Sequence, residues 1–411
     1  MRNNNKQFKG FIDTTFRDGQ QSPLMFDSYK YRLTFDDKKN LIYGLIKLGV
    51  RNFEFFSPVV SKSEYEDFIR LKKYIRSLKI NNILLLAHCR THPQDIKRAI
   101  EAGFDGLNIY IGMNENAQKF SHGVTFKEII KTGKNIIKKT RKSYPNIYIR
   151  FSAEDCFRTS LNDIFLMYDE VYEYVNTFGM PDTVGIATPS MVKERVIALR
   201  QRYPKTDLEC HFHNDRGLSL INAVTAISNG AAYIDTSIWG MAERSGITSI
   251  TGLLLNLFYE NKYLCKNYHL RLCYPLNVLM GLILKLHVPA NEPVSITNRT
   301  HTAGVHQKAV LNNSYVYEGH DLKIFGVNKN QLLLGPLSGK NLIYHYLREF
   351  QYYDLTKDQA LAIAKEFKSK SHEMNKKNKP EKILETITKH YHLPKLAIKE
   401  EYLKNRVENL D

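Results

Sequence analysis

The sequence has few cysteines, and their spacing does not indicate disulfide pairs. Five occur in 411 residues, scattered along the chain and without a Cys-x-x-Cys spacing, which favours reduced, buried thiols over a disulfide framework or a zinc ribbon. The chain also lacks a membrane-length apolar run, since its longest, around residues 278–284, falls far short of the roughly 20 residues that a span needs. Its first residues, MRNNNKQFKG, contain no apolar leader segment, so we expect a cytoplasmic protein with no membrane association.

Acidic residues are outnumbered by basic ones, and the formal net charge is +17. Such a charge is typical of nucleic-acid binding when Lys and Arg gather beside aromatic side chains. Here the lysines are spread along the expected helices, and the densest segment, residues 368–382, contains no aromatic residue that could stack on bases. We therefore expect no nucleic-acid partner. We interpret most of the charge as solvated surface, with a smaller role in attracting anionic substrates such as a CoA ester or a dicarboxylate.

Short apolar strands alternate with amphipathic helical segments, a rhythm typical of βα units. Eight such units fit before residue 262, and eight units in about 250 residues predict a closed (β/α)8 TIM barrel, an α/β fold. No expected strand carries Gly-x-Gly-x-x-Gly, so a dinucleotide-binding sheet has little support. The expected strands are 10–15, 52–58, 83–89, 106–112, 147–153, 175–181, 208–213 and 233–239.

After residue 262 the alternation stops, and the rest of the chain has a mainly helical pattern. We expect a catalytic barrel at 1–262, a C-terminal subdomain at 263–350 and a Lys-rich helical tail at 351–411. The segment 298–319 is polar and rich in His, Gly and Tyr, which is more typical of a catalytic loop than of a linker.

Polar side chains collect at the carboxyl ends of the expected strands, where barrel enzymes build their active sites. Each has a structural alternative, such as a helix cap for Asp18 or a salt bridge for Arg150, but their shared placement favours a single site. The candidates are Arg17, Asp18, His88, Arg150, Ser152, Glu154, Thr188, His211 and His213.

His211 and His213 stand two residues apart in the stretch DLECHFHND. Alternate residues of a strand point to the same face, so both imidazoles can reach one metal ion. With a carboxylate they would make an open site for a divalent cation, leaving positions for a chelating substrate. Taken alone, this spacing more often marks two structural histidines.

Eight motifs in order resemble the metal-dependent acyl-CoA aldol family of barrel enzymes, which includes the homocitrate, isopropylmalate and citramalate synthases. The resemblance is greatest to the homocitrate synthases and covers residues 8–350. The motifs are DTTFRDGQQS (13–22), SPVVS (57–61), AHCR (87–90), RFSAEDCFR (150–158), DTVGIATP (182–189), ECHFHNDRG (209–217), IDTSIWGMAERSGIT (234–248) and THTAGVHQKAVLNNSYVYE (300–318).

The resemblance implies a metal site and an oxyanion site. In this family the acid of an Arg-acid pair and both histidines hold the metal, which here are Asp18, His211 and His213, with Mg²⁺, Mn²⁺ or Zn²⁺ as the ion. Arg17 would help to stabilise the oxyanion. A 2-oxoacid that chelates such an ion has a polarised carbonyl that is ready for attack by carbon.

The implied nucleophile is the enolate of acetyl-CoA, the co-substrate, and a base must remove its methyl proton. His306 is the first candidate for proton transfer, with Tyr317 nearby and Glu154 as the second candidate. The resemblance implies a homodimer that exchanges the loop carrying His306. Hydrolysis of the thioester would then release CoA.

Substrate choice is implied by Arg150, Ser152 and His88, which resemble the set that homocitrate synthases use for the distal carboxylate of 2-oxoglutarate, and Thr188 joins them as a substrate-binding candidate. Arg fits a carboxylate bidentately. We therefore expect homocitrate and CoA as products. Oxaloacetate giving citrate, 2-oxoisovalerate giving isopropylmalate and pyruvate giving citramalate remain alternatives.

The chain departs from the family in its first motif, where Asp18 stands in place of a common Glu. Phe16 and Gln20 replace a common Leu and Glu. These differences affect the choice of 2-oxoacid substrate more than they affect the metal site. Three other interpretations of the barrel are a metal-dependent acyl-CoA lyase, a biotin-dependent carboxyltransferase and a non-catalytic barrel that binds RNA or a protein.

Overall fold

The computed structural model describes residues 8–115 and 117–396. The chain divides into two compact units, one of residues 1–295 with 324–326 and one of residues 296–323 with 327–411. The expected boundary at residue 262 falls at the end of α9 (Ile250–Asn261), and the first unit continues through α10 (Cys273–Leu284).

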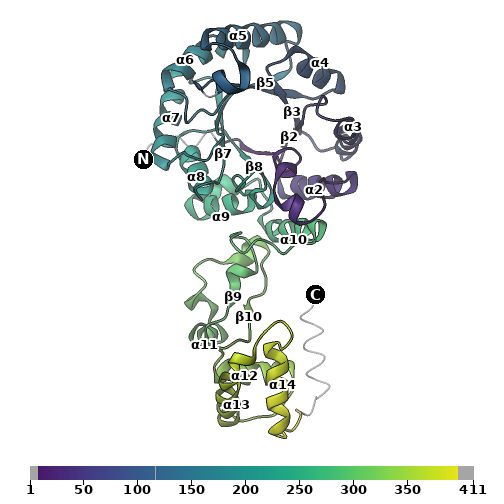
Figure 1. Ribbon diagram of the computed structural model, residues 1–411, viewed down its shortest axis with the longest axis vertical. Coiled ribbons are helices and arrows are strands. Elements are labelled where there is room, and N and C mark those ends of the chain that lie inside the picture. The colour runs from purple at the N-terminus through teal and green to yellow at the C-terminus, as the bar shows by residue number, and fades with distance from the viewer. Residues whose placement is uncertain (1–7, 116, 397–411) are drawn as a thin grey trace. The chain divides into compact units, whose positions relative to one another are not determined.

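The first unit confirms the expected (β/α)8 barrel (Figure 1). Each strand pairs in parallel with the next, and β8 pairs with β1, so the sheet has no open edge. The strands are β1 (Gly10–Asp13), β2 (Asn52–Phe56), β3 (Leu84–Arg90), β4 (Gly106–Gly112), β5 (Tyr148–Glu154), β6 (Thr177–Asp182), β7 (Asp207–Phe212) and β8 (Tyr233–Thr236).

Helices follow the strands and form a ring outside them (Figure 1). Local sequence signals fix the ends of the helices. Thr34 and Asp37 form a capping box at the start of α2, and Gly49 ends that helix with a φ of 123°. The helices are α1 (Leu24–Asp27), α2 (Phe35–Leu48), α3 (Lys62–Ser77), α4 (Pro93–Ala102), α5 (Phe126–Ser143), α6 (Leu161–Asp169), α7 (Pro189–Arg202) and α8 (Ser219–Asn229), followed by α9 and α10.

The two faces of the strands carry different side chains. Phe151 and Phe178 are buried, and each lies against Tyr168 of α6, so this face forms the apolar layer between strands and helices. On the other face, Arg150 of β5 contacts Glu54 of β2 and Asp235 of β8. Because these strands are not neighbours, the three charged side chains meet inside the barrel.

The second unit is mainly helical, as expected. A two-stranded parallel sheet of β9 (Thr300–His301) and β10 (Gln331–Leu332) accompanies its helices, and apolar side chains such as Ile343, Ile363, Phe367 and Ile387 form its core. The helices are α11 (Gly304–Asn312), α12 (Lys340–His345), α13 (Lys357–Ser369) and α14 (Pro380–His390).

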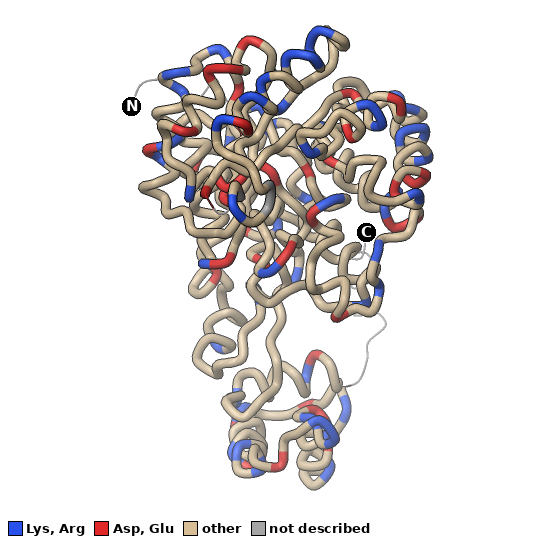
Figure 2. Tube along the Cα trace, turned by 45° about the horizontal axis from the view of Figure 1, so that its top comes forward, with Lys and Arg blue, Asp and Glu red and all other residues tan. Residues whose placement is uncertain are grey.

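Lys and Arg are spread over many helices rather than gathered in one segment (Figure 2), which agrees with the distribution expected from the sequence. Among the described residues, no helix is both long enough and apolar enough to cross a membrane.

Candidate active site

The barrel encloses a polar cavity of about 210 Å³. Its lining draws on the ends of several strands, the place where barrels position catalytic groups. The residues expected from the sequence that line it are Arg17, Asp18, His88, Arg150, Ser152, Glu154, His211 and His213. Further residues in the lining are Gln21, Asn108, Tyr110, Pro181, Thr183, Glu209, Asp235 and Glu243.

Thr188 lies outside this lining. It caps α7, because its side chain accepts a hydrogen bond from the Met191 amide at 3.4 Å, and the threonine in the cavity lining is Thr183. A Thr directly before a helix that begins with Pro is a common N-cap arrangement. A role for Thr188 in substrate binding therefore rests on the resemblance alone.

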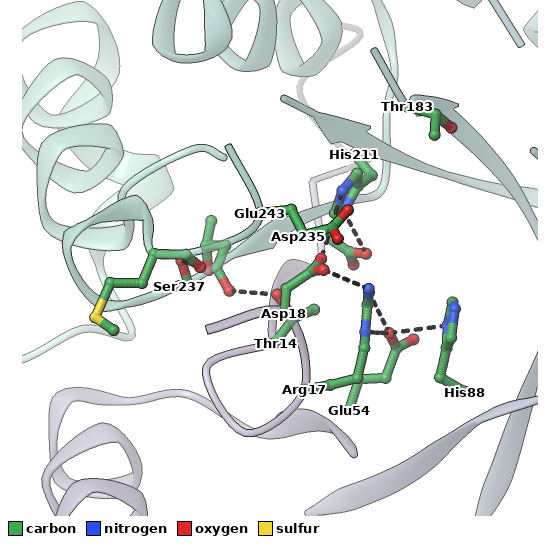
Figure 3. Close-up of polar contacts among 12 residues, drawn as sticks. Thr14, Arg17, Asp18, Glu54, His88, Thr183, His211, Asp235, Ser237 and Glu243 are labelled. Atoms are coloured by element: carbon green, nitrogen blue, oxygen red, sulfur yellow. Dashed lines mark hydrogen bonds and ion pairs between the residues drawn. The ribbon is translucent and has the colours of Figure 1, made fainter. Parts of the chain in front are cut away.

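Asp18, His211 and His213 meet in the cavity. Asp18 begins a short 3-10 helix after β1, His211 belongs to β7, and His213 follows that strand. Nε2 of His211 lies 3.6 Å from Oδ2 of Asp18 (Figure 3), and the centroids of the two imidazole rings are 5.0 Å apart. Two ligands that each bind one ion at about 2.1 Å lie roughly 3 to 4 Å from each other, so the first pair already has a suitable separation.

Two atoms of this group support the fit to a cation. Oδ2 of Asp18 and Nδ1 of His213 are buried and make no hydrogen bond within the described part of the chain. Buried polar atoms are normally satisfied, and an exception often marks an ion or a water molecule. Over residues 8–115 and 117–396, no group of three or more His, Cys, Asp and Glu side chains could hold a metal ion in its present arrangement, so the three donors would have to close further around an ion.

The hydrogen bond of His211 and the pKa of His213 suit metal binding. Nδ1 of His211 donates a hydrogen bond to Oδ2 of Asp235 at 3.1 Å, so Nε2, the atom that faces Asp18, is the nitrogen that can bind a metal. Burial and the neighbouring His211 lower the pKa of His213 to about 3. His213 is therefore neutral at physiological pH, as a metal ligand must be.

Arg150 lies among carboxyl groups. Its Nη2 is 2.5 Å from Oε2 of Glu54, and its Nη1 is 2.9 Å from Oδ1 of Asp235 and 3.5 Å from Oε2 of Glu209. Its Nε is buried and has no hydrogen-bond partner among the described residues. Arg150 thus has the structural ion pairs that were one alternative for it, and it keeps one donor for a further acceptor.

The carboxyl groups around Arg150 differ in their affinity for protons. Burial would raise the pKa of Glu54, but Arg150, Arg17 and His88 hold it well below its ordinary value. Burial raises the pKa of Glu209 well above its usual range despite the attraction of Arg150. Glu209 is therefore the group that holds a proton most readily.

Glu54 connects the two arginines of the cavity. Its Oε1 accepts hydrogen bonds from Arg17, with Nη2 at 2.7 Å, and its Oε2 contacts Arg150. Nη1 of Arg17 also lies 2.7 Å from Oδ1 of Asp18 (Figure 3). Burial and the charge of Arg17 lower the pKa of His88, which contacts Oε1 of Glu54 at 3.3 Å. Arg17 is thus held beside the candidate metal ligand Asp18.

Glu154 ends β5 and lines the same cavity. Burial and the neighbouring Asp155 raise the pKa of Glu154 above its ordinary value, although Arg17 opposes the rise. A carboxyl with a raised pKa is a stronger base than a free one, which suits proton transfer near neutral pH.

His306 and Tyr317 belong to the second unit. His306 lies in α11, and its ring stacks on Tyr317 with 3.9 Å between centroids. The structure thus brings together the two residues that the resemblance paired for proton transfer.

Sequence reasoning missed three charged residues of the cavity, Glu54, Glu209 and Asp235. Each lies in the interior of a strand and is at most 1% exposed. A single acid in a strand as apolar as NFEFF is itself a signal, since burial of an unpaired charge is costly. Their partners, however, come from distant strands and could not be identified before the barrel was closed.

Comparison with known proteins gives consistent matches. Residues 9–272 match the family model described as HMGL-like, and residues 294–375 match that described as homocitrate synthase post-HMGL domain-like. The chain is 34% identical over 336 residues to the mitochondrial homocitrate synthase of Schizosaccharomyces pombe, covering 81% of this chain and 77% of that protein. It is 34% identical over 361 residues to the cytosolic isozyme of homocitrate synthase of Saccharomyces cerevisiae, covering 87% and 81%.

Among solved structures, the hydroxymethylglutaryl-CoA lyase of Pseudomonas aeruginosa aligns with a TM-score of 0.57 at 16% identity, covering 70% of this chain and 96% of that chain. Similarity of this kind supports the fold of the barrel.

Replacement of His211 by Ala tests the candidate metal ligands. We expect His211→Ala to lose tight Mn²⁺ binding in equilibrium dialysis while the far-ultraviolet circular dichroism stays that of a folded barrel, because a donor is removed without a backbone change. His269→Ala, which removes an imidazole outside the cavity lining, is the matched control and should bind Mn²⁺ as the parent protein does. Retention of parental Mn²⁺ affinity by His211→Ala would rule out this ligand assignment.

Proposed function

The chain belongs to the HMGL-like family, and from this premise we propose that it condenses acetyl-CoA with 2-oxoglutarate to give homocitrate and CoA. The reaction is an acyl transfer in which the acyl group becomes an alkyl group. The observation that carries the proposal is the cavity in which Asp18, His211 and His213 lie beside Arg17, in a chain 34% identical to homocitrate synthases over most of its length.

A divalent cation at this site, Mg²⁺, Mn²⁺ or Zn²⁺, would supply Lewis-acid polarisation of the keto oxygen. Asp18, His211 and His213 are the residues that would hold it. Arg17, fixed by Glu54 and Asp18, would donate to the oxygen on which negative charge develops when the methyl carbon of acetyl-CoA bonds to the keto carbon. Water then hydrolyses the thioester, and CoA leaves as a free thiol.

Arg150 and Ser152 are proposed to bind the distal carboxylate of the oxoacid, with His88 beside them. Support comes from their place in the cavity lining and from the buried Nε of Arg150, which has no partner among the described residues. Oγ of Ser152 donates to Asn108 at 3.1 Å and so has a fixed orientation. These side chains form a polar pocket, whereas a branched-chain oxoacid would require an apolar one.

Removal of the methyl proton is proposed to involve His306 with Tyr317, and Glu154 is the second candidate. In the second unit, Val305 and Val316, the sequence neighbours of His306 and Tyr317, are 73% and 58% exposed. Exposed apolar side chains of this kind suggest that another surface covers them. We propose that this surface is the barrel of the partner subunit in a homodimer with exchanged segments.

The compartment is proposed to be the cytoplasm. All five cysteines are free and buried, which suits a reducing environment.

Release of free thiol from acetyl-CoA tests the reaction. With Mg²⁺ or Mn²⁺ present, we expect CoA release with 2-oxoglutarate and much less with oxaloacetate, pyruvate or 2-oxoisovalerate. Addition of a chelator should abolish the signal. A folded, metal-loaded protein that releases no thiol with any of the four oxoacids would contradict the proposal and favour a lyase, for which cleavage of a 3-hydroxyacyl thioester is the assay.

Replacement of Arg150 tests recognition of the distal carboxylate. Arg150→Lys keeps the buried positive charge but loses the planar fork, so we expect the KM for 2-oxoglutarate to rise by about tenfold or more, equivalent to one charge-assisted hydrogen bond. The KM for pyruvate, which has no distal carboxylate, is the internal control and should change much less. Equal effects on both oxoacids would assign Arg150 a purely structural role.

The pH dependence of kcat/KM tests Glu154. A base works only when it is deprotonated, so activity that depends on Glu154 should fall as the pH drops through its pKa, which lies above the ordinary value near 4.5. We expect Glu154→Gln to lower kcat by roughly 10²-fold or more and to remove this acidic limb. A Glu154→Gln variant with the parental rate and pH profile would leave His306 as the remaining candidate.

A further inference from the structure

Asp235 holds a central place in the cavity that neither the motifs nor the proposed chemistry assigns. It lies in β8, is 1% exposed, and contacts Arg150 through both carboxyl oxygens, with Oδ2 at 3.4 Å from Nη2. Oδ2 accepts the hydrogen bond from Nδ1 of His211 at 3.1 Å, and Oδ1 accepts one from Nη1 of Arg150 at 2.9 Å. A single rigid strand residue therefore contacts both a candidate metal ligand and the candidate carboxylate-binding arginine.

The contact with His211 determines which nitrogen of that ring can bind a metal. An ionised carboxylate can only accept, so Nδ1 of His211 carries the proton and Nε2 is the nitrogen through which this ring can bind a metal. Nε2 is the atom that faces Asp18 at 3.6 Å (Figure 3). A carboxylate behind a metal-binding histidine fixes its tautomer and raises its basicity, and loss of such a partner typically costs 10- to 100-fold in metal affinity.

The contact with Arg150 fixes the guanidinium on its other side. Glu54 holds Nη2 at 2.5 Å, and Asp235 holds Nη1. Because Glu54 of β2 and Asp235 of β8 each hold a terminal nitrogen, the orientation of the guanidinium is fixed. Arginine discriminates a carboxylate by its orientation as well as by its charge.

We propose that Asp235 is a positioning residue that links metal binding to oxoacid recognition, because it orients both His211 and Arg150. The metal half of this proposal depends on the residues of the barrel alone, and the oxoacid half rests on the proposed function. Glu209 provides a comparison, because it lies 3.5 Å from Arg150 in the same cavity but, within the described residues, forms no hydrogen bond or ion pair with the imidazole of His211.

The test compares Asp235→Asn with Glu209→Gln, two acid-to-amide changes of nearly unchanged size. In Asp235→Asn the amide oxygen can continue to accept from Arg150, which leaves the amide NH₂ facing Nδ1 of His211. His211 would then accept at Nδ1 and carry its proton on Nε2, where a metal should bind. Glu209→Gln alters the surroundings of Arg150 and keeps the carboxylate of Asp235 that faces Nδ1 of His211.

Mn²⁺ affinity of the full-length protein, measured by electron paramagnetic resonance, is the first readout. We expect Asp235→Asn to weaken Mn²⁺ binding by about 10- to 100-fold and Glu209→Gln to stay within about twofold of the parent. At saturating Mn²⁺, we expect Asp235→Asn also to raise the dissociation constant for 2-oxoglutarate, measured by calorimetry. Parental Mn²⁺ affinity in a folded Asp235→Asn protein, or unchanged 2-oxoglutarate affinity, would overturn the proposal.

A measurement on the unaltered protein covers the case in which Asp235→Asn does not fold. Long-range ¹⁵N–¹H correlation spectra of the metal-free protein report the tautomer of each histidine, and the signal of His211 is identified by its loss in His211→Ala. The proton is expected on Nδ1, and a proton on Nε2 would refute the positioning role. If no oxoacid is turned over, the proposed function fails, while the Mn²⁺ and tautomer results still decide the role of Asp235.

Discussion

The ion pairs of Arg150 inside the barrel are the interaction on which the rest of the site depends. A guanidinium that is 1% exposed is tolerated only because carboxyl groups from β2, β7 and β8 surround it. Removal of one partner from such a group typically costs about 3–5 kcal/mol. The ion pairs therefore stabilise one register of the closed sheet. That register also brings Arg17, Asp18 and His211 to a common cavity.

The charges of this cavity also explain which ligands it suits. Asp18, Glu54 and Asp235 face two guanidiniums, those of Arg17 and Arg150, and Glu209 holds a proton most readily because burial raises its pKa. The carboxyl groups of the cavity, among which Glu154 and Glu243 also belong to the lining, therefore outnumber the two guanidiniums. A divalent cation beside the unpaired Oδ2 of Asp18 would offset part of this negative charge and so favour the binding of a dicarboxylate.

The barrel was predictable because its signal is repeated. The alternation of strands and helices, and the absence of Gly-x-Gly-x-x-Gly, led to eight strands whose positions the structure confirms. The polar strand ends also led to eight residues of the cavity lining, because parallel strands finish at one face whatever their order.

The remaining parts of the site depend on contacts that no local pattern contains. Glu54 and Asp235 contact Arg150 across the barrel, and only closure of the sheet makes them neighbours. Thr188 has the sequence context of a helix cap as well as that of a binding residue, and in the structure it forms the cap. His306 and Tyr317 could be paired only through the resemblance, since their stacking is set within the second unit.

We propose that the barrel binds its oxoacid through a cation held by Asp18, His211 and His213. Calorimetric titration of 2-oxoglutarate into the full-length protein tests this directly, once with saturating Mn²⁺ and once with excess chelator. We expect binding with one site per chain in the presence of Mn²⁺ and no measurable heat of binding in chelator. Equal affinity under both conditions would contradict the claim and place oxoacid recognition on the arginines alone.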